Sequence, residues 1–109
     1  TKKDADHIFD EALMLEQLGA FSIVLECIPH ALGRRITEAL RIPTIGIGAG
    51  PDTDGQILVL HDMLGFDSPV HPRFVRRYAS LDEKVGKALA AYKEDVLKGK
   101  YPNLKESFA

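Results

Sequence analysis

One carboxylate near the start of the chain is placed where it could act as a base. Glu26 follows the apolar run 21–25 and is followed by Cys27 and Pro29. An ionised carboxylate is costly to bury without a partner, so this position favours the tip of a buried strand, where the side chain can meet a ligand. Partial removal from water makes such a group a candidate general base. The alternative is a strand-end glutamate that turns into solvent or pairs with an arginine.

A glycine-rich turn is the second candidate for a ligand contact. Residues 46–50 are Gly-Ile-Gly-Ala-Gly and follow Thr44-Ile45. The dinucleotide fingerprint G-x-G-x-x-G is excluded because its last glycine would fall on Pro51, and no phosphate-binding G-x-x-x-x-G-K-[ST] motif is present. The glycines either let the backbone approach a ligand, such as a phosphate or a pterin, or relieve crowding at the rim of a barrel.

Other polar residues give weaker indications of chemistry. Asp52-x-Asp54-Gly55 lacks the remaining ligands of a calcium loop and is typical of a turn. His61-Asp62 is either a ligand pair or proton relay, or a hydrogen-bonded histidine followed by a helix-capping aspartate. Cys27 is expected to be buried and inert.

Hydrophobic periodicity predicts the elements that position these residues. Buried strands are predicted at 21–26, 44–48 and 57–60, and helices at about 4–18, 30–40 and 81–98. At 57–60 a helix is the competing interpretation, because Asp54 could cap it. Pro72 predicts a further short helix with Phe74, Val75 and Tyr78 on one face.

The long helix over 81–98 carries two specific expectations. Ser80-x-x-Glu83 predicts a capping box at its start. Its apolar positions recur at helical spacing and are expected to face inward; they are Leu81, Val85, Ala88, Leu89, Tyr92 and Val96.

Short buried strands joined by helices predict an α/β fold with a parallel sheet. Three parallel strands cannot cover both faces of a sheet alone, so we expect them to be part of a larger sheet or about a third of a (β/α)₈ barrel, a fold that needs about 250 residues. We expect one structural unit over 1–109, with barrel elements at 1–65 and C-terminal helices and tail at 66–109. In such barrels the chemistry lies at the carboxyl ends of the strands.

Composition narrows the classes of function. The chain has 109 residues and a formal net charge of −2, so it lacks the basic character of a nucleic-acid-binding domain. The single cysteine excludes an internal disulfide and fits a reducing compartment. No apolar stretch is long enough to span a membrane. Since the chain begins at Thr1, we expect it to be a piece of a longer cytoplasmic protein, or of a mitochondrial one if the source is eukaryotic.

The order of several motifs resembles one enzyme family over essentially the whole chain. The similarity is to the C-terminal part of ketopantoate hydroxymethyltransferases. It rests on Gly19-Ala20-Phe21-x-x-Val24-Leu25-Glu26-x-x-Pro29, on Ile36-Thr37, on Ile42-Pro43-Thr44-Ile45-Gly46-Ile47-Gly48-Ala49-Gly50, on Asp54-Gly55-Gln56-Ile57-Leu58-Val59-x-His61-Asp62-Met63-Leu64-Gly65, on Phe74-Val75-x-x-Tyr78 and on Tyr101-Pro102…Ser107-Phe108.

This resemblance implies a reaction and a fold. Members of the family are (β/α)₈ barrels of the phosphoenolpyruvate/pyruvate superfamily, so the resemblance implies that this chain is the C-terminal portion of such a barrel, about the last three strands and their helices. They transfer a hydroxymethyl group from 5,10-methylenetetrahydrofolate to α-ketoisovalerate (3-methyl-2-oxobutanoate), giving ketopantoate for pantothenate and coenzyme A synthesis. A divalent metal, usually Mg²⁺, chelates the 2-oxo acid, and a glutamate that Glu26 matches removes the proton beside the keto group.

The resemblance also suggests lower-ranking site residues. Ile47 and Val59 are expected to contact the isopropyl group of the substrate, unless they are ordinary core, and Gly48 and Gly50 are expected on the folate side. The family's metal ligands lie on early strands, so we expect no metal ligand in this chain and no turnover by the chain alone.

Two alternatives stay open. The chain could be a non-catalytic assembly piece, because the family forms symmetric homo-oligomers, commonly decamers, through C-terminal helices. It could also derive from a carbon–carbon lyase of the same superfamily that acts on a 2-oxo acid.

Overall fold

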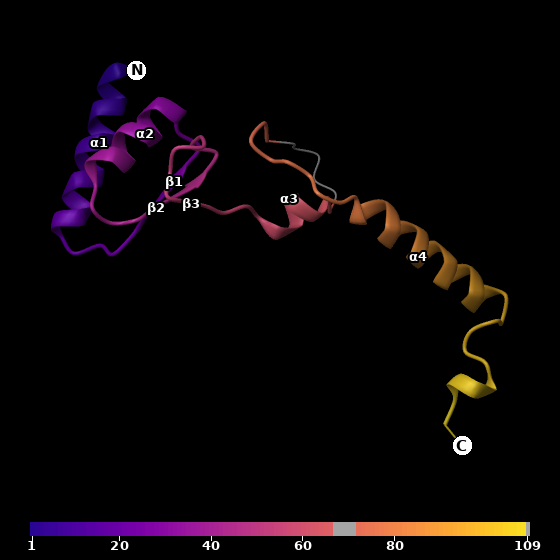
Figure 1. Cartoon of the computed structure of the whole chain (residues 1–109). Coiled ribbons are helices and arrows are strands. Elements are labelled where there is room, and N and C mark those ends of the chain that lie inside the picture. The colour runs from indigo at the N-terminus through magenta and orange to yellow at the C-terminus, as the bar shows by residue number, and fades with distance from the viewer. Residues whose placement is uncertain (67–71, 109) are drawn as a thin grey trace. The chain divides into compact units, whose positions relative to one another are not determined.

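The structure is a computed structural model that describes residues 1–66 and 72–108 (Figure 1). In these residues the chain forms helices and short strands in the order α1 (Lys2–Gln17), β1 (Ile23–Glu26), α2 (His30–Ala39), β2 (Thr44–Ile47), β3 (Gly55–Gln56), α3 (Leu60–Leu64), α4 (Leu81–Leu97) and the 3₁₀ turn η1 (Leu104–Glu106).

The contacts divide the chain into two compact units. The first unit comprises residues 1–59 together with 72–75, and the second comprises the remainder. The single unit expected over 1–109, with its division between 65 and 66, therefore stays a prediction.

The first unit is built on a parallel sheet in the order β1-β2-β3. The pairing of β1 with β2 places Glu26 opposite Ile47 and Leu25 opposite Gly46. Only two residues of β3 pair with β2. An α/β arrangement with a parallel sheet is thus confirmed.

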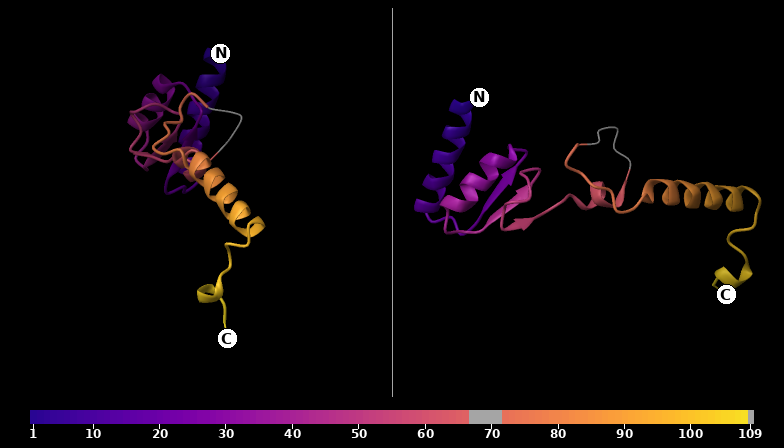
Figure 2. Two further views of the ribbon diagram at one scale, coloured as in Figure 1. Left: turned by 90° about the vertical axis from the view of Figure 1, so that its right-hand side faces the viewer. Right: turned by 45° about the horizontal axis from the view of Figure 1, so that its top comes forward.

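Both helices of the first unit cover the same face of this sheet (Figure 2). The core under them contains Leu25 from β1, Ala12 from α1, and Leu32 and Ile36 from α2. Directly paired residues of neighbouring parallel strands project to the same side, and successive residues alternate. The other face therefore carries two pairs of partners, which are Val24 with Ile45 and Glu26 with Ile47.

A buried hydrogen-bond network fixes the start of β2. Thr44 is fully buried, and its hydroxyl lies 2.8 Å from the hydroxyl of Thr37 on α2. The Asp54 carboxylate accepts from the Thr44 amide at 2.8 Å and from the Thr44 hydroxyl at 3.0 Å. Asp54 thus ties the end of the loop after β2 to the beginning of the same strand.

The strand predicted at 57–60 is wrong. The Ile57 amide still donates to the Gly46 carbonyl at 3.0 Å, but pairing then ends and α3 begins at Leu60. Periodicity cannot distinguish a strand from a helix in an apolar run of this length. The competing interpretation was closer, although Asp54 does not cap the helix, because its carboxylate is used at Thr44.

The short helix predicted from Pro72 is also wrong. Only one turn forms there, closed by the Val75 amide donating to the Pro72 carbonyl at 3.0 Å. In the second unit, the Tyr78 amide instead donates to the Met63 carbonyl at 2.8 Å. That non-local bond replaces the i to i−4 bond that a helix would need.

The helix α4 confirms the predicted position but not the predicted environment. It spans Leu81–Leu97, and Gly99 beyond its end has a φ of 65°. Ser80 occupies the N-cap position but makes no side-chain capping bond, so the predicted capping box is wrong. No α4 residue is buried; the expected inward face is an exposed apolar stripe that includes Val85, Leu89, Tyr92 and Val96. None of the described helices is long and apolar enough to cross a membrane.

The network around Thr44 predicts a stability effect. In the full-length protein, Asp54→Ala is expected to lower the free energy of unfolding by about 1–3 kcal/mol, because the buried Thr44 amide and hydroxyl lose their acceptor. Urea unfolding followed by circular dichroism measures the change. Asp52→Ala is the matched control, since its side chain accepts none of these bonds; equal losses in the two variants would contradict the assigned role of Asp54.

Candidate active site

The side chain of Glu26 is exposed at the carboxyl end of β1. Ile47, its partner on β2, is 8% exposed and lies on the same sheet face. Within the described residues, Glu26 makes no ion pair or side-chain hydrogen bond. The structure therefore leaves the carboxylate available on the face that α1 and α2 do not cover.

The residue after Glu26 holds a strained backbone conformation. Cys27 has a φ of 53°, and it is the one non-glycine residue with positive φ among those described. Its amide donates to the Ile47 carbonyl at 2.8 Å, which ties this turn to the end of β2. Strain of this kind persists where the surroundings fix it, and it clusters at functional sites. The cysteine is exposed, so the expectation of a buried Cys27 is wrong.

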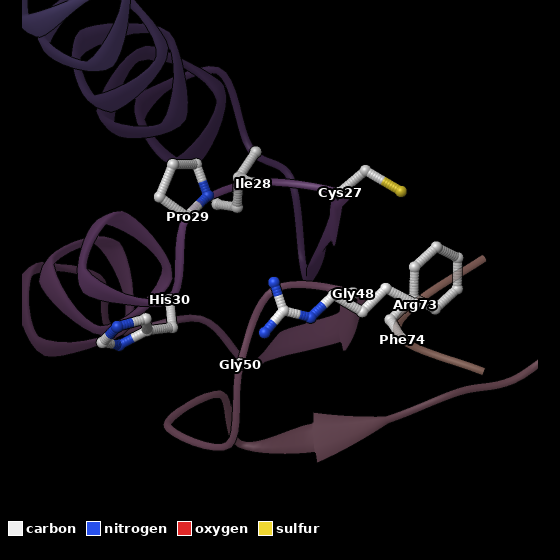
Figure 3. A pocket seen from close by; sticks show the side chains of 8 residues that line it. All are labelled: Cys27, Ile28, Pro29, His30, Gly48, Gly50, Arg73 and Phe74. Atoms are coloured by element: carbon white, nitrogen blue, oxygen red, sulfur yellow. The ribbon is translucent and has the colours of Figure 1, made fainter. Parts of the chain in front are cut away.

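An open pocket of about 610 Å³ lies where β1 and β2 end (Figure 3). One wall comes from the turn after β1, another from the glycine loop after β2, and a third from the segment 72–75. Glu26 does not line the pocket, but it directly precedes Cys27, which does. The lining residues are Cys27, Ile28, Pro29, His30, Gly48, Gly50, Arg73 and Phe74.

Gly48 and Gly50 shape two walls of this pocket. Gly48 has a φ of 67°, and a β-carbon there would lie 2.9 Å from the Phe74 ring. Gly50 has a φ of 89°, and a β-carbon there would lie 2.4 Å from the β-carbon of His30. Of the two interpretations of the glycine-rich turn, relief of crowding is the one that these contacts favour. A folate contact at these glycines stays a prediction.

The structure brings two basic side chains to the pocket that the sequence did not single out. Figure 3 shows the Arg73 guanidinium extending across the pocket from the Phe74 side toward His30. Neither spacing nor composition could have placed residue 73 beside residues 30 and 48, because that contact depends on tertiary folding.

The remaining predicted site residues are dispersed. Val59 lies beyond the end of β3 and is 49% exposed, whereas Ile47 is buried within β2. Their shared apolar wall stays a prediction. His61 lies in α3 of the second unit, where its ring packs against Phe66 with the centroids 5.2 Å apart.

The described residues do not make a metal site by themselves. Across residues 1–66 and 72–108, no three histidine, cysteine, aspartate or glutamate side chains are close enough to hold an ion. The Mg²⁺ that the resemblance implies therefore has no set of ligands among them.

Comparisons with known proteins place this geometry in a family. The model of a family described as ketopantoate hydroxymethyltransferase matches residues 1–104. A 3-methyl-2-oxobutanoate hydroxymethyltransferase of Chlorobaculum parvum is 50% identical over 105 residues, covering 96% of this chain and 38% of the relative. The 3-methyl-2-oxobutanoate hydroxymethyltransferase of Moorella thermoacetica is 48% identical over 108 residues, covering 99% of this chain and 40% of the relative.

The chain belongs to the ketopantoate hydroxymethyltransferase family, as the sequence motifs predicted. It spans about two fifths of the length of the curated relatives that it matches.

The crowding at Gly50 predicts a matched pair of substitutions. In the full-length protein, Gly50→Ala is expected to lower the free energy of unfolding by about 1–3 kcal/mol, because φ is positive and the new methyl group meets His30. Thermal and urea unfolding measure the change.

Gly86→Ala is the control for that substitution. A β-carbon at Gly86 meets nothing within 4 Å, and the residue lies inside α4. Alanine there is expected to stabilise the protein by about 0.5–1 kcal/mol. A Gly50→Ala protein as stable as the unmodified one would contradict the packing described for the pocket wall.

Proposed function

We propose that the full-length protein containing this chain transfers a hydroxymethyl group to 3-methyl-2-oxobutanoate and that Glu26 is its catalytic base. The observation that carries the proposal is the position of Glu26 in a chain of this family. Its carboxylate is unpaired within the described residues, and Glu26 lies at the carboxyl end of a parallel strand, one residue before Cys27 of the pocket wall. The curated relatives are named for this reaction.

We propose further that the first unit is the last part of a (β/α)₈ barrel, with the earlier strands supplied by the rest of the full-length protein. A parallel sheet in a barrel has helices outside and side chains filling the interior. The one-sided cover by α1 and α2 supports this assignment, because Val24 is 55% exposed on the opposite face. In a closed barrel, Val24 and Glu26 would both project inward.

The chemistry assigned to this chain is proton removal. The Glu26 carboxylate takes a proton from the carbon beside the keto group, and the electrons of that carbon–hydrogen bond move toward the keto oxygen. The nucleophilic carbon then forms a bond to the one-carbon unit of 5,10-methylenetetrahydrofolate, and the two bonds from that unit to the folate nitrogens break. Water supplies the hydroxyl group, and tetrahydrofolate leaves with the proton that Glu26 removed and the second proton of that water on its two nitrogens. Ile47 is the partner of Glu26 on β2. Mg²⁺ belongs to the proposal as an ion held by residues outside this chain.

Replacing the base tests the proposal. In the full-length protein, Glu26→Gln is expected to lower kcat by about 10²–10⁴, the usual contribution of a positioned base, while the fold is kept. Ketopantoate formation measures turnover. Exchange of the substrate's C3 proton in D₂O, without the folate, measures the proton-removal step by itself.

Two controls complete this experiment. Glu38→Gln removes an exposed carboxylate that pairs with Arg34 on α2, so it should keep both rates. The isolated 109-residue chain should form no ketopantoate. Wild-type exchange by the Glu26→Gln protein would contradict the base assignment, and a carbon–carbon cleavage product in place of ketopantoate would favour the lyase alternative.

A second candidate function is assembly, and the exposed stripe of α4 favours it. Leu89 is 63% exposed and Tyr92 is 57% exposed on a helix with no buried residue. Apolar side chains aligned on one helix face are typical of a surface that another element covers. We propose that α4 contributes to a homo-oligomeric contact of the full-length protein.

A charge on this stripe tests the assembly role. Leu89→Glu is expected to lower the oligomeric state of the full-length protein, because a carboxylate in an apolar contact is costly. Light scattering after size exclusion measures the mass. Lys87→Glu, on the opposite side of α4, is the charge-change control and should leave the mass unchanged; equal masses for all three proteins would contradict an α4 contact.

A further inference from the structure

We propose that Gln56 is a positioning residue for proton removal by Glu26, and that it acts through the glycine loop after β2 (residues 48–50). The inference rests on the proposed function, and it assigns a role to a side chain of the third strand. Gln56 lies on β3, and its side-chain amide is bonded to the glycine loop. The loop directly continues the strand end that holds the turn after Glu26.

The side-chain amide of Gln56 connects the glycine loop to β3. Its Nε2 donates to the Gly50 carbonyl at 2.8 Å and to the Thr53 hydroxyl oxygen at 2.9 Å. The Thr53 hydroxyl donates its own proton to the Gly55 carbonyl at 2.9 Å. Because an amide nitrogen carries two hydrogens and a hydroxyl carries one, each of these hydrogens has one acceptor. The network therefore has a single direction of donation and holds the Gly50 carbonyl in place.

A glycine in β2 makes room for this network. Gly46 is the partner of Gln56 in the pairing of β2 with β3. A β-carbon at Gly46 would lie 2.6 Å from the Thr53 hydroxyl oxygen and 3.2 Å from Gln56 Nε2. Any side chain at position 46 would therefore push the two polar groups apart. The first glycine of the run 46–50 thus serves the network, and the network is part of the strand pairing.

The glycine loop needs a bond of this kind because its backbone is intrinsically free. Gly48 has a φ of 67° and Gly50 has a φ of 89°, and glycine has more backbone freedom than any other residue. Crowding against α2 limits the loop on one side, where a β-carbon at Gly33 would lie 2.5 Å from the Ala49 carbonyl oxygen. Gln56 holds the loop on the other side, from β3.

The loop is connected to the base through one peptide group. The Ile47 carbonyl belongs to the peptide that joins Ile47 to Gly48, and it accepts from the Cys27 amide at 2.8 Å. Rotation at Gly48 would turn this carbonyl away from Cys27. The positive φ of Cys27, 53°, persists only while its surroundings fix it, and Cys27 directly follows Glu26. Misplacement by about 1 Å can cost about 10²-fold in rate, so loss of the Gln56 bonds is expected to slow proton removal.

Replacing both donors tests the positioning role in the full-length protein. Gln56→Met keeps the length of the side chain and removes the amide. The rate of C3 proton exchange of saturating 3-methyl-2-oxobutanoate in D₂O is expected to fall about tenfold per folded molecule. The Kd of this oxo acid should stay the same. Amide hydrogen exchange of the peptide that contains Cys27, measured by mass spectrometry, should become faster because its bond to Ile47 opens more often.

Three variants serve as controls. Thr53→Val removes the second acceptor and is expected to lower the rate less than Gln56→Met, because the bond to Gly50 remains. Thr53→Ser restores the hydroxyl and should recover the rate. Gln17→Met is the same substitution at an exposed residue of α1 that makes no side-chain hydrogen bond within the described residues, and it should change none of these quantities. Thermal unfolding gives the folded fraction of each protein.

The outcomes separate this inference from the proposed function. Equal substrate exchange by the Gln56→Met and unmodified proteins overturns the positioning role, while ketopantoate formation still supports the proposed reaction. A loss that follows the folded fraction also overturns it, because the role is then structural, and so does a higher Kd with an unchanged rate, because Gln56 then acts in binding. An unmodified protein that exchanges no substrate proton overturns the proposed reaction and the positioning role together, and the Cys27 peptide then shows separately whether Gln56 holds the turn.

Discussion

The arrangement of the first unit depends on the parallel pairing of β1 with β2. That pairing sets Glu26 beside Ile47 and brings the turn after β1 next to the glycine loop after β2. A parallel sheet buries both of its faces in a complete domain. Here α1 and α2 cover one face, and the other carries apolar residues that end in a carboxylate. The constraint on this unit is therefore that its uncovered face has to pack against something else.

The same pairing requires small residues at close contacts. A β-carbon at Gly33 on α2 would lie 2.5 Å from the Ala49 carbonyl oxygen, so this helix approaches the end of β2 more closely than any side chain would allow. A β-carbon at Gly50 would collide with His30 in the same way. The glycine loop is thus fixed by crowding on both sides. A rigid loop suits a pocket wall, because the ligand does not have to order it.

The sequence predicted the elements whose patterns were long or buried on one face. For five elements the observed bounds lie within two residues of the predicted ones, because the apolar pattern extends over the whole element; these are α1, β1, α2, β2 and α4. Predictions failed where a single non-local bond decided the structure. Asp54 is committed to Thr44, and Tyr78 is bonded to Met63, so neither segment forms the element that its local pattern favours.

The site was predictable only in its local part. A carboxylate after an apolar run and glycines after the next strand are visible in the sequence, and both fall at the strand ends that the structure joins. Arg73 and Phe74 were not predicted in the pocket, because they reach it from a distant segment through tertiary contacts. For α4 the helix was predicted correctly, but the apolar stripe predicted to face inward is exposed. Periodicity shows which residues share a helix face and does not say which molecule or segment covers that face.

The exposure of Glu26 is a consequence of the uncovered sheet face and does not argue against a role as base. Its side chain projects on the same side as Val24, and that valine is 55% exposed for the same reason. A valine in a strand of a parallel sheet is an interior residue. Any segment that covers Val24 therefore also removes water from the carboxylate of Glu26, which lies two residues further along β1 on the same face. The bond from the Cys27 amide to the Ile47 carbonyl holds the backbone next to Glu26 against the end of β2, so the side chain starts from a fixed point on that face.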